Sequence, residues 1–193
     1  MTDARLPSLA VSLEDGTVYT VRPVTADDKE LIKTGFDRLS PRSRYLRFFA
    51  ATPELSRGQL AYLSELDHRN HVALGLLDGE NPAAVGRWVR FDDVPDAADV
   101  ALTVIDDYQR RGIGRLLLKL LALAARHRGV RWLHFDVLAE NRGMLRVLDG
   151  FDAVRTETGP IIHAVLDADT VGHPAGVTGD LGHVLDRAAS RAS

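Results

Sequence analysis

The stretch Gln109-Arg110-Arg111-Gly112-Ile113-Gly114 follows an apolar segment and leads directly into a Leu-rich one. Its two glycines allow a sharp backbone turn with no Cβ in the way, so consecutive N–H groups can point toward one anion. A helix that begins here would add the positive end of its dipole. The stretch therefore predicts a phosphate-binding loop at the start of a helix.

Two better-known glycine loops do not fit this stretch. A P-loop needs Lys-Ser or Lys-Thr after its last glycine, where Arg115-Leu116 stands. A dinucleotide-binding loop needs a third Gly or Ala where Leu117 stands. What remains is Gln/Arg-x-x-Gly-x-Gly/Ala between a strand and a helix. This is the acyl-coenzyme A loop of the GCN5-related N-acetyltransferase (GNAT) superfamily, which the chain resembles.

The resemblance covers roughly residues 17–166. A strand, the loop, a helix, a second strand, an Asn and a Gly-Phe pair follow in the family's order, at residues 98–105, 109–114, 115–128, 130–138, 141 and 150–151. Upstream, residues 21–28 resemble the first strand and its exit, and residues 39–49 are similar to a segment of bacterial protein-lysine acetyltransferase catalytic domains. The resemblance implies an α/β (α+β) fold: a central mixed, mostly antiparallel sheet flanked by helices and splayed at the strand before the loop.

The resemblance also implies acetyl-CoA as acyl donor and assigns it to the backbone of this strand and loop. The residues concerned are Val104, Ile105, Gln109, Arg110, Arg111, Gly112, Ile113, Gly114 and Arg115. The Val104 N–H is expected to bind the acetyl carbonyl, which requires a splay between residues 103 and 105; a fully paired strand is the alternative. The loop arginines either contact phosphates or are solvated, and Arg115 is the best placed.

Asn141 matches the family's Asn after this second strand, which implies a bond to the pantetheine arm of the coenzyme. Asn is also strongly favoured as a helix N-cap, and this alternative explains the residue almost as well.

Asp99 stands where many relatives have the Glu that serves as general base, and its shorter side chain favours a water relay. The alternative is that Asp99 only caps the strand edge. His134 and Asp136 share a face of the following strand by its two-residue period and provide a second base candidate, although most such pairs are structural.

Leu148 stands where many relatives have a Tyr that protonates the departing thiolate. Either the thiolate leaves unassisted or another Tyr, such as Tyr45, serves. Arg42, Arg44 and Arg47 either line the acceptor side or form a solvated helix face.

The composition narrows the class of protein. With 193 residues, 45% of them hydrophobic, the chain favours one domain over two. A net charge of −3 argues against a nucleic-acid surface. The lack of cysteine excludes disulfides, a thiol nucleophile and a thiolate metal site. The seven histidines lack metal-ligand spacing, so no metal is expected. With no signal-peptide pattern and no run of roughly 20 apolar residues, a cytoplasmic protein without membrane contact is expected.

Local patterns predict the remaining elements. A strand is expected over residues 17–21, a helix from an Asp27 cap to Arg38, and a second helix capped by Ser40 with Pro41 in its first turn. Apolar spacing predicts a helix over residues 55–66, and a turn-rich break predicts a hairpin of residues 71–77 and 83–91.

The C-terminal region is expected to stand apart, with a GNAT domain over residues 1–168 and a Gly/Pro-containing linker and short helix over residues 169–193. The linker covers residues 171–179, and Asp180 could cap the helix. Its apolar stripe, formed by Leu181, Val184, Leu185 and Ala188, either folds back on the domain or binds a second copy, so the protein is expected to be a monomer or a homodimer.

The sequence thus predicts an enzyme that transfers an acetyl or other short acyl group from acetyl-CoA to a primary amine. A protein lysine is the preferred acceptor, and a small-molecule amine is almost equally favoured. The alternative from another class is a regulatory module that senses acyl-CoA with little or no catalysis.

Overall fold

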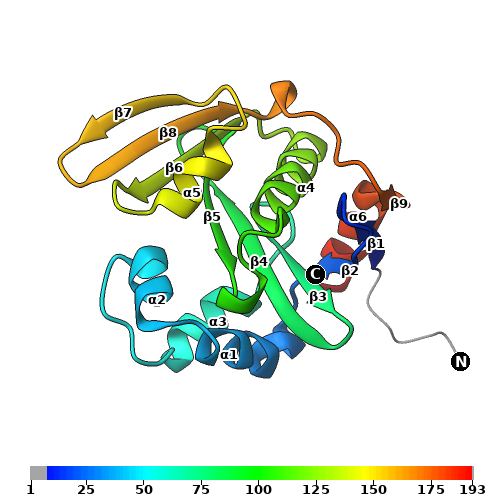
Figure 1. Ribbon diagram of the computed structural model, residues 1–193. Helices are drawn as coiled ribbons and strands as arrows, with labels where there is room; N and C mark the ends of the chain where they lie inside the picture. The colour runs from blue at the N-terminus through cyan, green and yellow to red at the C-terminus, as the bar shows by residue number, and fades with distance from the viewer. Residues whose placement is uncertain (1–7, 193) are drawn as a thin grey trace, which may run out of the picture.

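The computed structural model describes residues 8–192, and its centre is one nine-stranded sheet of order β7-β8-β6-β5-β4-β3-β2-β1-β9 (Figure 1). The strands are β1 (Leu9–Ser12), β2 (Val18–Pro23), β3 (His71–Asp78), β4 (Asn81–Arg90), β5 (Ala97–Val104), β6 (Trp132–Leu138), β7 (Val154–Thr158), β8 (Ile161–Asp167) and β9 (Val177–Thr178). The helices are α1 (Lys29–Asp37), α2 (Pro41–Phe48), α3 (Arg57–Ser64), α4 (Ile113–His127), α5 (Arg142–Leu148) and α6 (Leu181–Ala192). Neighbouring strands are antiparallel except β5 and β6, so the predicted mixed sheet is confirmed.

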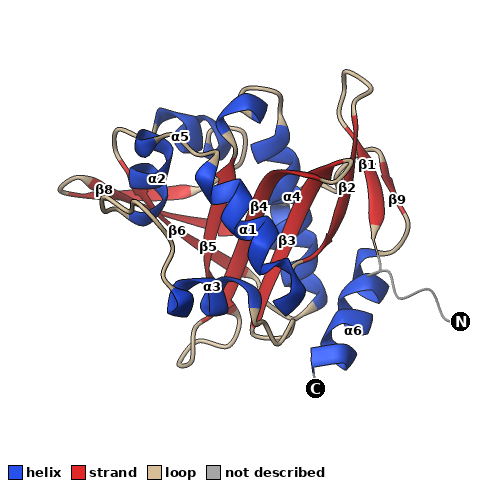
Figure 2. Ribbon diagram, turned by 90° about the horizontal axis from the view of Figure 1, so that it is seen from below, coloured by secondary structure: helices blue, strands red, loops and turns tan. Residues whose placement is uncertain are grey.

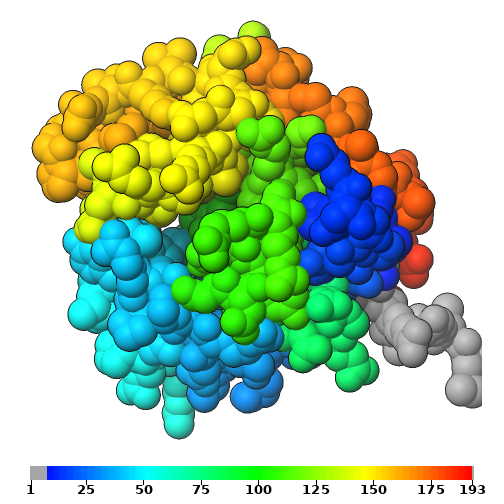
Figure 3. All heavy atoms as spheres, in the orientation of Figure 1, coloured from blue at the N-terminus to red at the C-terminus, as the bar shows by residue number. Residues whose placement is uncertain are grey.

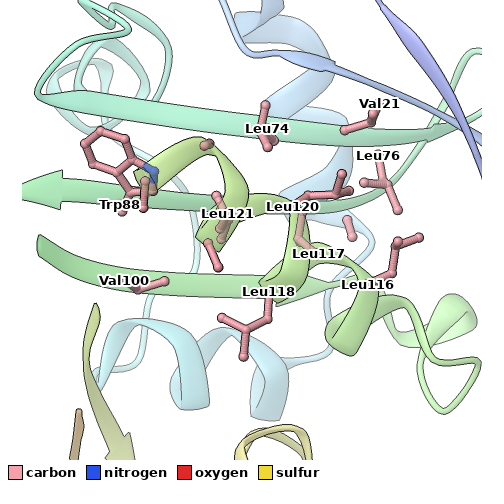
Figure 4. Packing of buried hydrophobic residues seen from close by; sticks show 14 of the residues in the cluster. Val21, Leu74, Leu76, Trp88, Val100, Leu116, Leu117, Leu118, Leu120 and Leu121 are labelled. Carbon is pink, nitrogen blue, oxygen red and sulfur yellow. The ribbon is translucent and has the colours of Figure 1, made fainter. Parts of the chain in front are cut away.

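Helices cover both faces of the sheet (Figure 2). α4 packs on one face of β3, β4 and β5, while α1 and α3 lie on the other. Five leucines of α4 are buried, and Figure 4 shows them beside Leu74, Trp88 and Val100: Leu116, Leu117, Leu118, Leu120 and Leu121. A Cβ on Gly86 of β4 would lie 2.7 Å from the Leu121 side chain, so glycine lets α4 approach the sheet closely. The Leu-rich helix is therefore core, as its pattern predicts.

The predicted hairpin is present as β3 and β4, which pair from His71 with Val89 to Asp78 with Asn81. The turn is tighter than predicted, because β4 begins at Asn81 and Gly79 takes a left-handed φ of 59°. Ser40 caps α2 as predicted: its Oγ accepts the Ser43 N–H at 3.1 Å, with Pro41 in the first turn.

The predicted Asp27 cap is wrong. Residues 26–28 form a single 3-10 turn and α1 begins at Lys29. The neighbouring Asp28 decides this geometry, since its carboxylate accepts the Thr25 N–H at 2.8 Å and two bonds from the Arg22 guanidinium at 2.7 and 2.6 Å. These bonds hold the tighter turn against β2.

The C-terminal region continues the sheet. Residues 171–179, predicted to be a linker, contain β9, which pairs with β1. The apolar stripe of α6 is buried, and the helix packs on α4. Asp186 forms a hydrogen bond with His127 Nε2 at 3.1 Å and an ion pair with Arg128 at 2.6 Å. Of the two alternatives for this stripe, the structure has the helix folded back on its own chain. Within residues 8–192, no helix has the length and apolar character needed to cross a membrane.

Candidate active site

A groove of about 820 Å³ opens between α2, the end of β5, the loop before α4, and α5. Figure 3 shows the surface hollowed between the cyan α2 region, the green loop and the yellow α5 region. The groove is lined by seven of the predicted site residues: Val104, Gln109, Arg110, Gly112, Gly114, Arg115 and Asn141. The glycine loop and the Asn therefore meet at one site, although they lie on different elements.

The loop backbone has the shape expected of an anion-binding turn. Arg110 and Gly112 both take left-handed conformations, with φ of 62° and 86°. Gly112 is the N-cap of α4 and provides no side-chain acceptor, so the N–H groups of the first turn have no capping partner there. Because these groups carry the positive end of the helix dipole, this end of the groove favours phosphate. The helix includes Ile113 and Gly114, two residues earlier than predicted.

Two glycines bring Arg115 and α5 against the loop. A Cβ on Gly114 would lie 3.0 Å from a Val147 methyl group of α5, so only a very small residue fits where the two helices meet. A Cβ on Gly150 would overlap the Arg115 guanidinium, which also lies over the Phe151 ring at 6.0 Å. The Gly-Phe pair thus holds Arg115 at the groove wall.

β5 leaves β6 before it reaches the loop, as the predicted splay requires. In the described chain the two strands pair only over residues 97–99, while β5 stays paired with β4 as far as Val104. The Ile105 N–H donates to Ala83 O of β4 at 3.0 Å. Since successive N–H groups of a strand point to opposite sides, the Val104 N–H faces the gap left by β6. The Val104 carbonyl accepts a bond from Gln109 Nε2 at 3.1 Å.

Three predicted coenzyme contacts are placed differently. Ile105 is buried with its N–H already bonded to β4, and Ile113 is 1% exposed in the core. Arg111 stacks on the Tyr108 ring at 5.5 Å. None of the three is among the described residues that line the groove, so any contact through Ile113 would use its backbone.

Asp99 lies on the face of the sheet opposite α4, where the base candidates come together. His134 of β6 is its register partner, and Asp136 lies one period further along the same face, bonded to His163 Nδ1 at 2.5 Å. Although Asp99 is exposed, partial desolvation and the Asp136 charge raise its pKa, against the opposing charges of Arg47 and His134. The sequence did not indicate His163 as a candidate, because no pattern predicted the strand β8.

Neither Tyr45 nor Tyr108 is placed to replace the missing acid. Leu148 is fully buried in the core, and Tyr45 is 37% exposed but is not part of the groove wall. Tyr108 does line the groove, but its hydroxyl donates to Asp78 Oδ2 at 3.1 Å. An unassisted thiolate is the alternative that this arrangement favours.

The three arginines of α2 have separate roles. Arg42 spans the groove to Glu140, at 2.9 Å. Arg44 braces the surrounding loops, donating to Pro53 O at 2.6 Å and lying over the Phe36 ring. Arg47 lines the groove. Across residues 8–192, no group of three or more acidic or histidine side chains is arranged to hold a metal ion.

Comparison with known proteins gives the family. The model of the acetyltransferase (GNAT) family matches residues 37–151. An acetyltransferase named Pat from Mycolicibacterium smegmatis is 32% identical over 153 residues, 78% of this chain and 46% of its own length. An acetyltransferase of Pseudomonas aeruginosa is 31% identical over 137 residues, 69% of this chain and 73% of its own. The chain belongs to the GNAT family.

A solved structure agrees with this assignment. The GNAT domain of the S. lividans protein PAT superposes with a TM-score of 0.79 at 31% identity, covering 83% of this chain and 96% of that domain. The chain spans about half the length of its Mycolicibacterium relative.

Proposed function

We propose that this chain transfers an acetyl or other short acyl group from coenzyme A to a primary amine, with a protein lysine as the preferred acceptor. The observation that carries the proposal is the groove. It joins an uncapped helix N-terminus, suited to the pyrophosphate, to a strand edge left open by β6, suited to the pantetheine arm. The relatives named acetyltransferases, Pat among them, support acetyl transfer, while the preference for lysine rests on the resemblance of residues 39–49.

Each reaction step has a candidate group in this chain. The Val104 N–H would hold the thioester carbonyl and stabilise the negative charge that develops on its oxygen. Asp99 would take the proton of the incoming ammonium, directly or through a water molecule. The C–N bond then forms, the C–S bond breaks, coenzyme A leaves as the thiolate, and the second proton of the nitrogen passes to solvent.

The first experiment is a calorimetric titration with acetyl-CoA and with desulfo-CoA. Micromolar binding of both is expected, because the proposed contacts involve the phosphates and the arm rather than the sulfur. No heat with either ligand, in folded protein, would contradict the proposal.

A second candidate function is an acyl-CoA sensor with little catalysis, favoured by the burial of Leu148 where a general acid is usual. Free-thiol release separates the two functions. The chain has no cysteine, so a thiol reagent would detect released coenzyme A without protein background. Release that requires an amine or a lysine peptide would exclude the sensor, and binding without release would favour it.

A further inference from the structure

A small chamber lies beside the groove, between the sheet and the helices α1 to α3. Its volume is about 90 Å³ and its wall is mostly apolar, formed by residues such as Phe36, Leu63 and Ala101. Arg47 and Thr103 line both the chamber and the groove. The chamber therefore adjoins the proposed reaction centre at Val104.

Two arginines give this chamber an unbalanced positive charge. Its other charged residues, Arg22 and Asp28, neutralise each other in a two-bond ion pair. Arg87 is 5% exposed and bonds only neutral partners, His71 at 3.1 Å and Leu63 O at 3.2 Å. Arg47 makes no hydrogen bond or ion pair with any residue between 8 and 192, and its ring contact is with Phe48 at 5.1 Å.

The protonation states keep both charges in place. Desolvation and the neighbouring Arg47 lower the pKa of Arg87 to about 10, so it remains a cation at neutral pH. Desolvation and Arg87 lower the pKa of His71 to about 4, so His71 is neutral and does not add to the charge. Desolvation lowers the pKa of Arg47, and the charge of Asp99 opposes that shift.

A buried cation without an anionic partner is costly, and such groups cluster at ligand sites. An arginine fork matches the planar geometry of a carboxylate, with two parallel N–H···O bonds. Arg87 is also a diagonal neighbour of Asp99 on one sheet face, since their opposite partners are Ala101 and Val89. The place where Arg87 lacks an anionic partner is thus close to the reacting atoms.

The acyl chain is the group that can reach this site. It starts at the thioester, beside Val104, and would pass Thr103 into a chamber too small for a peptide segment. The acceptor approaches from the exposed patch around Asp99 and His134. From this juxtaposition we infer that the donor carries a short acyl chain ending in a carboxylate, of the malonyl or succinyl type, bound by Arg47 and Arg87.

This inference rests on the proposed function and leaves its chemistry unchanged. The amine still forms the C–N bond and loses its proton, and coenzyme A still leaves from the broken C–S bond. The terminal carboxylate takes no part in these steps and serves only to hold the chain.

The test compares succinyl-CoA with butyryl-CoA, which has the same chain length but ends in a methyl group, and with acetyl-CoA. Amine-dependent thiol release is measured with one fixed acceptor, a lysine peptide free of acidic residues. We expect kcat/KM for succinyl-CoA to exceed that for butyryl-CoA by about tenfold or more, because charge-assisted bonds form with one donor only. Equal values, or a preference for butyryl-CoA, would overturn the inference and leave the proposed function standing.

Variants assign the preference to the arginines. Arg87→Met and Arg47→Gln should each bring the succinyl-to-butyryl ratio close to one, while Arg57→Gln, at an exposed position of α3, should leave it unchanged. If Arg87→Met fails to fold, as circular dichroism would show, the partly exposed Arg47 still provides the test. An undiminished ratio in Arg47→Gln would contradict the assignment.

Two further outcomes have distinct meanings. The measurements are repeated with a second lysine peptide that carries an acidic residue. A preference for that peptide, whichever donor is used, would move the site to the acceptor and overturn the inference. No calorimetric binding of any of the three donors would overturn both the inference and the function on which it rests.

Discussion

Asp99 lies where charges of both signs meet. Partial desolvation and the negative Asp136 raise its pKa, while Arg47 and His134 oppose that effect. Its proposed role as base would therefore depend on neighbours from β6 and α2 as well as on its own position.

Replacing Asp99 with Asn should lower turnover by about 10²- to 10⁴-fold, the usual contribution of a general base. Acetyl-CoA affinity should change little, because Asp99 is not among the described residues that line the groove. Steady-state kinetics and calorimetry measure the two effects, with Asp152→Asn on an exposed turn as control. Unaltered turnover would eliminate Asp99 as the base.

The pH profile should respond to Asp136. The base form of Asp99 is the carboxylate, so activity is lost as the pH falls through its raised pKa. Asp136→Asn removes a negative neighbour, which lowers the pKa of Asp99 and moves the acidic limb of kcat/KM to lower pH. A shift to higher pH, or no shift, would mean that another group controls this limb.

At the scale of elements, the loop and α4 are proposed to act together, because left-handed residues in the loop would turn successive N–H groups toward one anion. Gly112 has φ of 86° and Gly129, just after α4, has φ of 71°. They therefore form a matched pair, one in the groove and one remote from it.

Gly112→Ala and Gly129→Ala should each cost about 1–2 kcal/mol of unfolding free energy, since both force a side chain into left-handed backbone. Only Gly112→Ala should weaken acetyl-CoA binding. Denaturant unfolding and calorimetry separate the effects, and equal affinity in both variants would mean that the loop does not hold the phosphates.

Asn141 caps α5, its Oδ1 accepting the Met144 N–H at 3.1 Å, and its amide is proposed to bind the pantetheine arm. Asn141→Ser keeps a capping oxygen, so stability should be nearly unchanged while acetyl-CoA affinity falls. Asn141→Ala should lose affinity and about 1 kcal/mol of stability. Full affinity in the Ser variant would leave the cap as the whole role of this residue.

The sequence predicted the elements whose periodicity or capping is strong. Local residues were enough to predict the loop, the hairpin, the Ser40 cap and the Leu-rich helix. They were not enough for β1 and β9, because β1 has four residues and β9 has two, and β9 lies next to β1 only through a pairing of distant segments. The charge of Arg87 was equally hidden, since it depends on which distant residues surround a strand position.

At the scale of the molecule, α6 is part of the packed body. Leu185 is fully buried against the core. Leu185→Ala should lower the unfolding free energy by about 2–5 kcal/mol, while exposed Arg187→Ala should change it little. Acetyl-CoA affinity should persist in both, since α6 does not contribute to the groove wall. A stable Leu185→Ala variant would contradict this packing.

The pairing of β1 with β9 also has a consequence for the order of folding. The Thr178 hydroxyl bonds to Ala10 O across 168 residues of chain. Closing so long a loop costs more entropy than forming the local β3–β4 hairpin, and contacts of high sequence separation slow folding. The sheet should therefore grow outward from its central hairpin, with the β1–β9 seam closing last and opening first during local unfolding.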